Sequence, residues 1–233
     1  MNVALILAGG VGQRVGLHIP KQFLEVRGKP ILAYTLSVFQ NHPDIDKICV
    51  VCVDGWEQEV ESYVERFGIT KLIKIIKGGD SNMMSIRNGV YGIGDIADKN
   101  DIVVVHDGVR PLIDGSIITD CIEKCKEFGN GCASIPLQET IVRTEDRISG
   151  KVNIDRSEVM RVQTPQAYRF DDIYGLYSEA ERVGITDSVY VNTLKMELGG
   201  TIYFSKGSSF NLKITTRDDL EMFDLLLNRT GRN

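Results

Sequence analysis

The 233-residue sequence predicts an α/β protein with a doubly wound, mostly parallel sheet. Three observations support this prediction. Apolar, β-branched runs alternate along the chain with stretches that have the period of an amphipathic helix. The runs are continuously apolar, which is typical of strands buried on both faces of a parallel sheet. Loops at 8–14, 78–85 and 106–111 each follow such a run, and in these sheets ligands bind at that end of the strands.

The predicted elements of the first half follow one another closely. The first strand covers residues 3–8, and a helix begins at Pro30, because proline is favoured at the first helical position, and ends at His42-Pro43. Glu57 to Phe67 is an amphipathic helix closed by Gly68. The remaining elements expected here are strands at 45–53, 71–77, 101–105 and 132–135, and helices at about 84–91 and 116–128.

The pattern changes at residues 138–158, which are polar and carry short β-type pieces on either side of Ser149-Gly150. This predicts a β-hairpin arm projecting from the main body. An isolated hairpin is marginally stable in water, so we expect the arm to pack on a second subunit. The rest of the chain predicts helices near 171–182, 187–198 and 217–227 and strands at 201–204 and 210–214. With no repeat or linker in the sequence, we expect residues 1–233 to form a single domain.

Composition excludes several classes of function. Apolar residues make up 42% and charged residues 25% of the chain, which is the usual mixture for a globular protein with a sizeable core. The formal charge of −5 argues against a general nucleic-acid or membrane-surface binder. No apolar run reaches the roughly 20 residues of a membrane span, and no targeting peptide precedes the first strand. We therefore expect a cytoplasmic protein.

The five cysteines are expected to be structural. An odd number without a secretion signal does not indicate a disulfide framework. Cys49 and Cys52 lie within a strand, where an odd spacing turns the two side chains to opposite faces. Cys121 and Cys125 lie one helical turn apart, but no histidine accompanies them. A metal site is therefore the less favoured interpretation.

The stretch from Leu5 to Arg14 joins the end of the first strand to three glycines, and Lys21 follows soon after. Glycines let the backbone approach an anion, exposed N–H groups point at it, and cations complete the site. The loop is not a dinucleotide fingerprint, because Val15 replaces the last glycine, and it lacks the Gly-Lys-Ser/Thr of a Walker loop. We therefore expect it to bind phosphates of another kind. The alternative is a tight turn with solvated cations.

Further motifs follow in order along the chain. They are Gly78-Gly79-Asp80 with Ser85 and Asn88-Gly89, His106-Asp107-x-x-Arg110-Pro111, Gln163-Thr164-Pro165-Gln166, Thr186-Asp187 and Asn211-x-Lys213-x-Thr215. Together with Leu7-Ala8-Gly9-Gly10-x-Gly12-x-Arg14 and Pro20-Lys21-Gln22, this set resembles the cytidylyltransferases acting on 2-C-methyl-D-erythritol 4-phosphate and on ribitol 5-phosphate. The resemblance covers essentially the whole chain, the hairpin included. It implies a Rossmann-like nucleotidyltransferase fold.

The resemblance also implies a reaction, in which a polyol phosphate attacks the α-phosphorus of CTP and yields a CDP-polyol and pyrophosphate. It assigns the neutralisation of phosphate charge to Arg14, Lys21 and Lys213. It places CTP at Leu7, Ala8, Gly9, Gly10, Gly12, Gly79, Asp80 and Ser85, and the acceptor at Asp107, Arg110, Thr140, Arg156, Thr164 and Thr186. From residues alone, Asp107 and Arg110 are alternatively a structural ion pair.

The resemblance further implies a cofactor and a partner. Mg²⁺ is expected to bind mainly through the CTP phosphates, with Asp107 as a candidate protein ligand. A second copy of the chain is expected as well, because in the family Thr140 and Arg156 on the hairpin reach the acceptor site of the partner subunit. The expected state is therefore a homodimer joined through the arm.

The chain departs from the family pattern at positions that bear on triphosphate binding and on the acceptor. Asn82 stands where an arginine is common, and Val142 stands where methylerythritol enzymes often carry a lysine or arginine. Thr186-Asp187 is followed by Ser188-Val189-Tyr190 instead of a second acidic residue. The changes facing the acceptor favour a pentitol or another glycan-building polyol over methylerythritol.

Other functions remain open from the residues alone. A nucleotidyltransferase for another sugar or polyol phosphate would use the same motifs. An NAD-type oxidoreductase would need an acidic residue at the end of the second strand, where Asp54 is the candidate. An inactive nucleotide-binding regulator is the third alternative, and it rests on the missing cation at Asn82.

Overall fold

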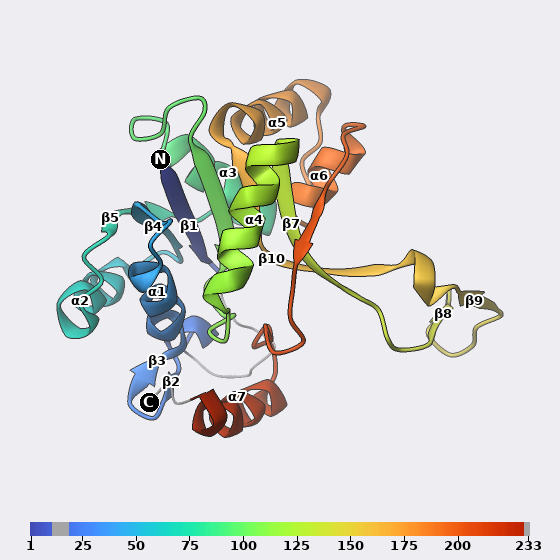
Figure 1. Ribbon diagram of the computed structural model, residues 1–233, viewed down its shortest axis with the longest axis horizontal. Helices are drawn as coiled ribbons and strands as arrows, with labels where there is room; N and C mark the ends of the chain where they lie inside the picture. Colours follow the sequence, from blue (N-terminus) through green and yellow to red (C-terminus); the bar gives the residue numbers. More distant parts are fainter. Residues whose placement is uncertain (11–18, 231–233) are drawn as a thin grey trace.

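The computed structural model describes residues 1–10 and 19–230 (Figure 1). A seven-stranded sheet has the order β11-β7-β10-β6-β1-β4-β5. Its strands are β1 (Asn2–Ala8), β4 (Lys47–Cys52), β5 (Leu72–Lys77), β6 (Ile102–Asp107), β7 (Asn130–Pro136), β10 (Met160–Arg169) and β11 (Phe204–Lys206). The helices are α1 (Ile31–Asn41), α2 (Glu57–Phe67), α3 (Asn82–Gly92), α4 (Gly115–Phe128), α5 (Phe170–Val183), α6 (Val191–Glu197) and α7 (Arg217–Thr230). The described residues also form the short 3-10 helices η2 (Lys21–Phe23) and η3 (Arg156–Glu158) and the small ribbon of β2 (Glu25–Val26) with β3 (Lys29–Pro30).

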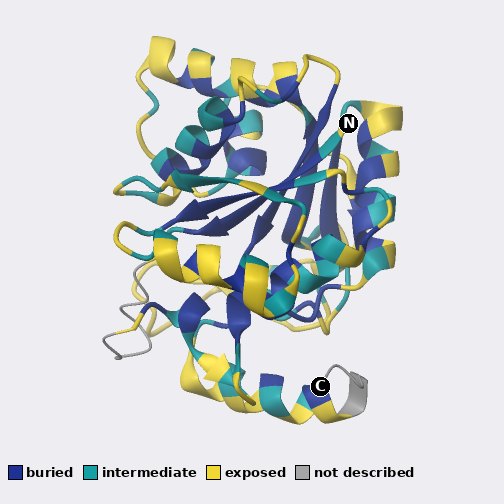
Figure 2. Ribbon diagram, turned by 90° about the vertical axis from the view of Figure 1, so that its left-hand side faces the viewer, coloured by how far each residue is buried: buried dark blue, intermediate teal, exposed yellow. Residues whose placement is uncertain are grey.

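Each face of the sheet is covered by its own set of helices, so the predicted doubly wound fold is confirmed. Alternate residues of β1 enter different cores: Ala4 and Ile6 pack with α1, α2 and α4, whereas Val3 and Leu5 pack with α3, α5 and α6. This explains why the strand is apolar throughout. Figure 2 shows the buried strands at the centre and exposed residues on the outward faces of the helices.

The cysteines follow the same rule. Cys49 lies in the core with α3, and Cys52 lies in the core with α1, on opposite faces of β4 as their spacing predicts. All five thiols are free and buried. Their burial raises the pKa of both Cys49 and Cys52 to about 12, so these thiols are protonated and unreactive at neutral pH.

One strand of the sheet was not predicted. β10 runs antiparallel between β6 and β7, whereas β1 pairs in parallel with both β4 and β6. The strand could not be recognised from the sequence because its middle is polar and contains Pro165. Its pairing with β7 is also irregular, with a register shift between Val162 and Gln166. The sheet is therefore mixed at this position, with Thr164 brought next to the end of β6.

Several other elements differ from the prediction, four of them near the end of β6 or in the C-terminal half of the chain. β6 continues through Asp107 instead of ending at residue 105, and α6 begins at Val191 rather than near 187. The predicted strand at 201–204 is displaced to Phe204–Lys206. Residues 210–214 form no strand, although Ile214 donates its N–H to the Val109 carbonyl at 2.9 Å. That contact brings the segment containing Lys213 to the end of β6.

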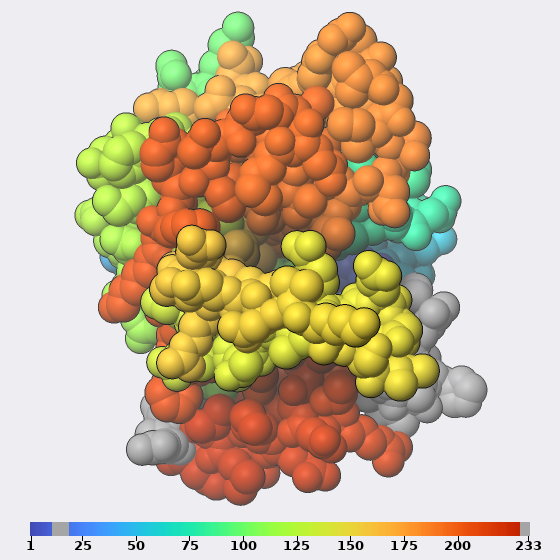
Figure 3. All heavy atoms as spheres, turned by 90° about the vertical axis from the view of Figure 1, so that its right-hand side faces the viewer, coloured from blue at the N-terminus to red at the C-terminus, as the bar shows by residue number. Residues whose placement is uncertain are grey.

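The predicted hairpin is confirmed as an arm. β8 (Ile141–Arg143) pairs antiparallel with β9 (Val152–Ile154), and the arm projects from the body (Figure 1). In Figure 3 it faces the viewer in yellow between α7 and the chain near α6. Val142, Ile148 and Val152 on the arm are exposed, Ile148 to 91%.

Candidate active site

A cavity of about 590 Å³ opens at the carboxyl ends of β1, β4, β5 and β6. Of the residues predicted to bind the nucleotide, its lining includes Leu7, Gly9, Gly10, Gly79, Asp80 and Ser85. Lys21, Asp107 and Lys213 line it as well. Two further predicted residues, Gly12 and Arg14, lie outside the described residues. The loops at 78–85 and 106–111 and the first glycines of 8–14 therefore meet at one site, as expected at the ends of parallel strands.

The glycines are required because two turns approach each other closely. A Cβ atom on Gly9 would lie 3.2 Å from Ser85 Oγ, and one on Gly78 would lie 3.1 Å from the Cys52 carbonyl oxygen. A Cβ atom on Gly79 would lie only 2.6 Å from the Cβ atom of Met84. The Ser85 hydroxyl joins the turn by accepting from the Gly79 N–H at 3.0 Å. A side chain would therefore not fit at Gly79 and would press on the neighbouring backbone at Gly78.

Gln22 is a site residue to which no role was assigned from sequence. Its side chain is 1% exposed, and its Nε2 donates to the carbonyl oxygens of Ala8 at 2.6 Å and Gly10 at 2.9 Å. These bonds connect η2 to the first glycine turn and place the neighbouring Lys21 at the cavity. The Ala8 carbonyl is thus engaged by Gln22, and Ala8 is not among the described residues that line the cavity. No sequence pattern specifies this role, because the partners of Gln22 are backbone carbonyls.

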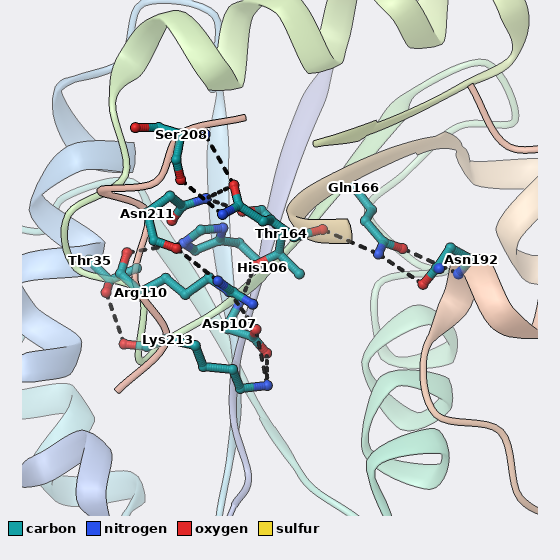
Figure 4. Close-up of polar contacts among 12 residues, drawn as sticks. Thr35, His106, Asp107, Arg110, Thr164, Gln166, Asn192, Ser208, Asn211 and Lys213 are labelled. Carbon is teal, nitrogen blue, oxygen red and sulfur yellow. Dashed lines mark hydrogen bonds and ion pairs between the residues drawn. The ribbon is translucent and has the colours of Figure 1, made fainter. Parts of the chain in front are cut away.

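Asp107 at the end of β6 is the centre of a buried charge cluster (Figure 4). Arg110 Nε lies 2.9 Å from Asp107 Oδ2, and Lys213 Nζ lies 3.1 Å from Oδ2 and 3.2 Å from Oδ1. The side chain of Asp107 is 8% exposed and that of Arg110 is 12% exposed, whereas that of Lys213 is 41% exposed. Lys213 is therefore the cation of the cluster that reaches the cavity.

Backbone groups hold this cluster in place. Arg110 donates to the Asn211 carbonyl at 2.8 Å, and Asn211 Nδ2 donates to the Thr164 carbonyl at 2.7 Å. The Thr164 hydroxyl accepts from the Asp107 N–H at 3.1 Å. β6, β10 and the segment before α7 thus meet at one point.

The electrostatics keep Asp107 charged. Burial alone would raise the pKa of its carboxyl group, but Lys213 and Arg110 outweigh it and lower the pKa to about 2. Burial lowers the pKa of the adjacent His106 to about 3, so that imidazole is neutral at pH 7. His106 is fully buried, with Nε2 3.3 Å from the Arg110 carbonyl oxygen. It is therefore a neighbour of the ion cluster and is shielded from the cavity.

The other residues predicted to bind the acceptor are dispersed. Arg110 is engaged in the ion cluster, as the structural alternative expected, and Thr164 is 3% exposed beneath it. Thr186 is exposed in the connection between α5 and α6. Thr140 and Arg156 are exposed on the arm, where Arg156 donates to the Gln138 carbonyl at 2.7 Å. Among described residues, none of these five lines the cavity.

A second ion pair at the rim was not predicted. Lys77, the last residue of β5, lies 2.8 Å from Asp54 at the end of β4, and both line the cavity. Hydrogen bonding to Asp54 raises the pKa of Lys77, and the pair places one ammonium and one carboxylate group at the rim of the cavity. Strand alternation alone could not reveal this pair, because it depends on the pairing of β4 with β5.

No helix within the described ranges is both long and apolar enough to cross a membrane. Nor do the described residues bring three or more histidine, cysteine, aspartate or glutamate side chains together in an arrangement that could hold a metal ion.

Comparison with known protein families shows to which family the chain belongs. The family described as IspD, 2-C-methyl-D-erythritol 4-phosphate cytidylyltransferase, matches residues 2–229. The chain belongs to the IspD family. The resemblance inferred from the motifs is thereby confirmed. Asp54, which the oxidoreductase alternative needed as a ribose-binding residue, instead pairs with Lys77.

Individual IspD relatives carry two different names. A ribitol-5-phosphate cytidylyltransferase of Lacticaseibacillus paracasei is 45% identical over 229 residues, covering 97% of this chain and 98% of the relative. A 2-C-methyl-D-erythritol 4-phosphate cytidylyltransferase of Clostridium acetobutylicum is 37% identical and covers 99% of both chains. The structure of 4-diphosphocytidyl-2C-methyl-D-erythritol synthase from Anaerococcus prevotii has a TM-score of 0.82 at 22% identity, covering 97% of this chain and 96% of that one. This last likeness concerns the fold alone.

Proposed function

We propose that this protein transfers CMP from CTP to ribitol 5-phosphate, producing CDP-ribitol and pyrophosphate. The observation that carries the proposal is the cavity in which two lysines, Lys21 and Lys213, face glycine turns at the ends of parallel strands in an IspD-family chain. The choice of acceptor is supported by the 45% identical relative and by Val142 and Ser188-Val189-Tyr190, which depart from the methylerythritol pattern.

In this reaction an oxygen of the acceptor phosphate attacks the α-phosphorus of CTP, and the bond to the β-phosphate breaks. The protein aligns the two substrates and neutralises charge, because positioned cations stabilise the developing charge of a transferring phosphoryl group. Lys213 is held at the cavity by Asp107, and Lys21 is held there by the turn that Gln22 fastens. We assign the α-phosphate to these two lysines and the cytosine to the backbone near Gly79, Asp80 and Ser85.

The residues around the cavity are compatible with a Mg²⁺ ion that binds together with CTP. Mg²⁺ supplies charge neutralisation on a triphosphate, keeps several waters and needs few protein ligands. Both carboxylate oxygens of Asp107 already contact cations, so a metal ion bound there would have to compete with Lys213. We therefore propose the CTP phosphates as the main ligands.

The test is a pyrophosphate-release assay that pairs CTP, UTP or ATP with ribitol 5-phosphate, 2-C-methyl-D-erythritol 4-phosphate or a sugar phosphate. We expect turnover with CTP, and kcat/KM for ribitol 5-phosphate at least about tenfold above that for the methylerythritol compound, because polar groups placed to bind one set of hydroxyls reject another. The reverse preference would reassign the acceptor. Absence of turnover with every pair would leave a nucleotide-binding regulator instead.

We also propose that the arm completes the acceptor site of a second subunit, since the arm projects from the body (Figure 1) and its exposed Thr140 and Arg156 are not among the described residues that line their own cavity. The exposed Val142 and Ile148 give the arm apolar surface to bury against a partner. Light scattering should give twice the chain mass for the full protein and a smaller mass after deletion of residues 144–151. A full-length protein that is already monomeric at assay concentration would refute the shared site.

A further inference from the structure

The connection between α5 and α6 is anchored at its two ends. Ile185 donates its N–H to the Ala180 carbonyl at 2.9 Å, and the buried Asn192 donates its N–H to Gln166 Oε1 at 3.2 Å. Ser188 between them is buried, but its hydroxyl has no hydrogen-bond partner among the described residues. Thr186 in the same segment is exposed.

The side chain of Asn82, which lines the cavity, forms a hydrogen bond to the middle of this segment. Asn82 Nδ2 donates to the Val189 carbonyl at 2.6 Å, across 107 positions of sequence. Within residues 1–10 and 19–230, this is the only hydrogen bond to residues 186–189. The side chain of Val189 is 76% exposed and adds little packing. Between its anchored ends, the segment therefore has the burial of Ser188 and the amide of Asn82 to hold its conformation.

Asn82 is well placed for such a link. It is the first residue of α3, directly after Ser81, whose hydroxyl accepts from the Met84 N–H at 3.1 Å and caps the helix. Asn82 also lines the cavity, beyond the Gly78-Gly79 turn. An arginine at this position would carry a cation on a long side chain, whereas asparagine offers a neutral amide of short reach.

We propose that Asn82 is a positioning residue that fixes the segment containing Thr186 relative to the nucleotide cavity and thereby sets the affinity for the polyol phosphate. This inference rests on the proposed function and on the acceptor role that the family resemblance implies for Thr186. A segment that is already ordered binds more tightly, because ordering a loop on binding costs conformational entropy. Asn82 would therefore contribute to acceptor binding without touching the transferred phosphoryl group.

Steady-state kinetics of Asn82→Ala test this role. We expect KM for ribitol 5-phosphate to rise about fivefold, which is the loss of one ordinary hydrogen bond, while KM for CTP and kcat stay within about twofold. The matched control is Val189→Ala, which keeps the accepting carbonyl and should behave as the unaltered protein. A rise in KM for CTP with no rise in KM for the acceptor would make Asn82 a nucleotide contact and overturn the proposal.

A second measurement does not require activity. NMR order parameters of the backbone amides of residues 186–190 should lie near 0.85 in the ligand-free protein and in Val189→Ala, and should fall below about 0.6 in Asn82→Ala. Unchanged order parameters in Asn82→Ala would refute the positioning role whatever the reaction is. If the order parameters fall but no acceptor is turned over, the proposed function fails and the structural link stands.

Discussion

Lys213→Ala is expected to lower kcat for pyrophosphate release about 10²- to 10³-fold, the effect seen when one preorganised group that stabilises transition-state charge is removed. Lys213 is the member of the Asp107 cluster that lines the cavity, and its Nζ is held 3.1 Å from Asp107 Oδ2. Its charge is thus in position before the substrates bind. Lys213→Arg should not restore the rate, because a planar guanidinium cannot take the place of a compact ammonium held by one carboxylate.

The matched control for this substitution is Lys206→Ala. Lys206 lies on β11, pairs with Ser116 at 2.8 Å and does not line the cavity among the described residues. Its loss should leave kcat within about twofold, since exposed polar contacts contribute little. Lys21→Ala should resemble Lys213→Ala, because Lys21 faces the same cavity from η2. Full turnover in both lysine variants would refute the proposed mechanism.

Asp107→Asn is expected to destabilise the folded protein by about 3 kcal/mol, because removing one partner of a buried ion pair leaves the other charge uncompensated. Arg110, with its side chain 12% exposed, would keep its bond to the Asn211 carbonyl but would face a neutral amide in place of the carboxylate. Lys213, at 41% exposed, would turn toward solvent and lose less. For a chain of this length the melting temperature should fall by roughly 6–12 °C.

Asp95→Asn is the control for that measurement. Asp95 also forms an ion pair, with Lys74 at 2.8 Å, but its side chain is 69% exposed. Solvent screens such a pair, so its loss should cost less than about 1 kcal/mol. Equal unfolding free energies for the two variants, measured by denaturant titration, would mean that the Asp107 cluster contributes no more than a surface salt bridge.

The residues that local rules govern were predicted well. α2 has the predicted bounds, Glu57–Phe67, and ends at Gly68 with a φ of 65°, because an amphipathic period and a left-handed glycine are both local properties. β1 was predicted because a strand buried on both faces must be apolar throughout. The hairpin arm was predicted because its residues are polar, and polar strands do not pack into the core.

Errors arose where distant partners decide the structure. β10 contains a polar, proline-bearing sequence, and it is a strand because β6 and β7 lie on either side of it. The orientation of Arg110 could not be predicted for the same reason, because it is set by Asp107 and by the carbonyl of Asn211, which lies 101 positions away in the chain. Gln22 received no role, because its partners are backbone carbonyls that no sequence pattern specifies.

The sequence by itself determined the α/β class, the glycine turns at the strand ends, the arm and the family of the protein, because these follow from side-chain periodicity, backbone sterics and ordered motifs. Only the tertiary structure decided that Lys213 is held by Asp107 across 106 positions and that Asn82 holds Val189 across 107. Such contacts depend on the packing of strands and loops remote in sequence. A carboxylate or an amide has several chemically equivalent partners along the chain, and the fold selects one.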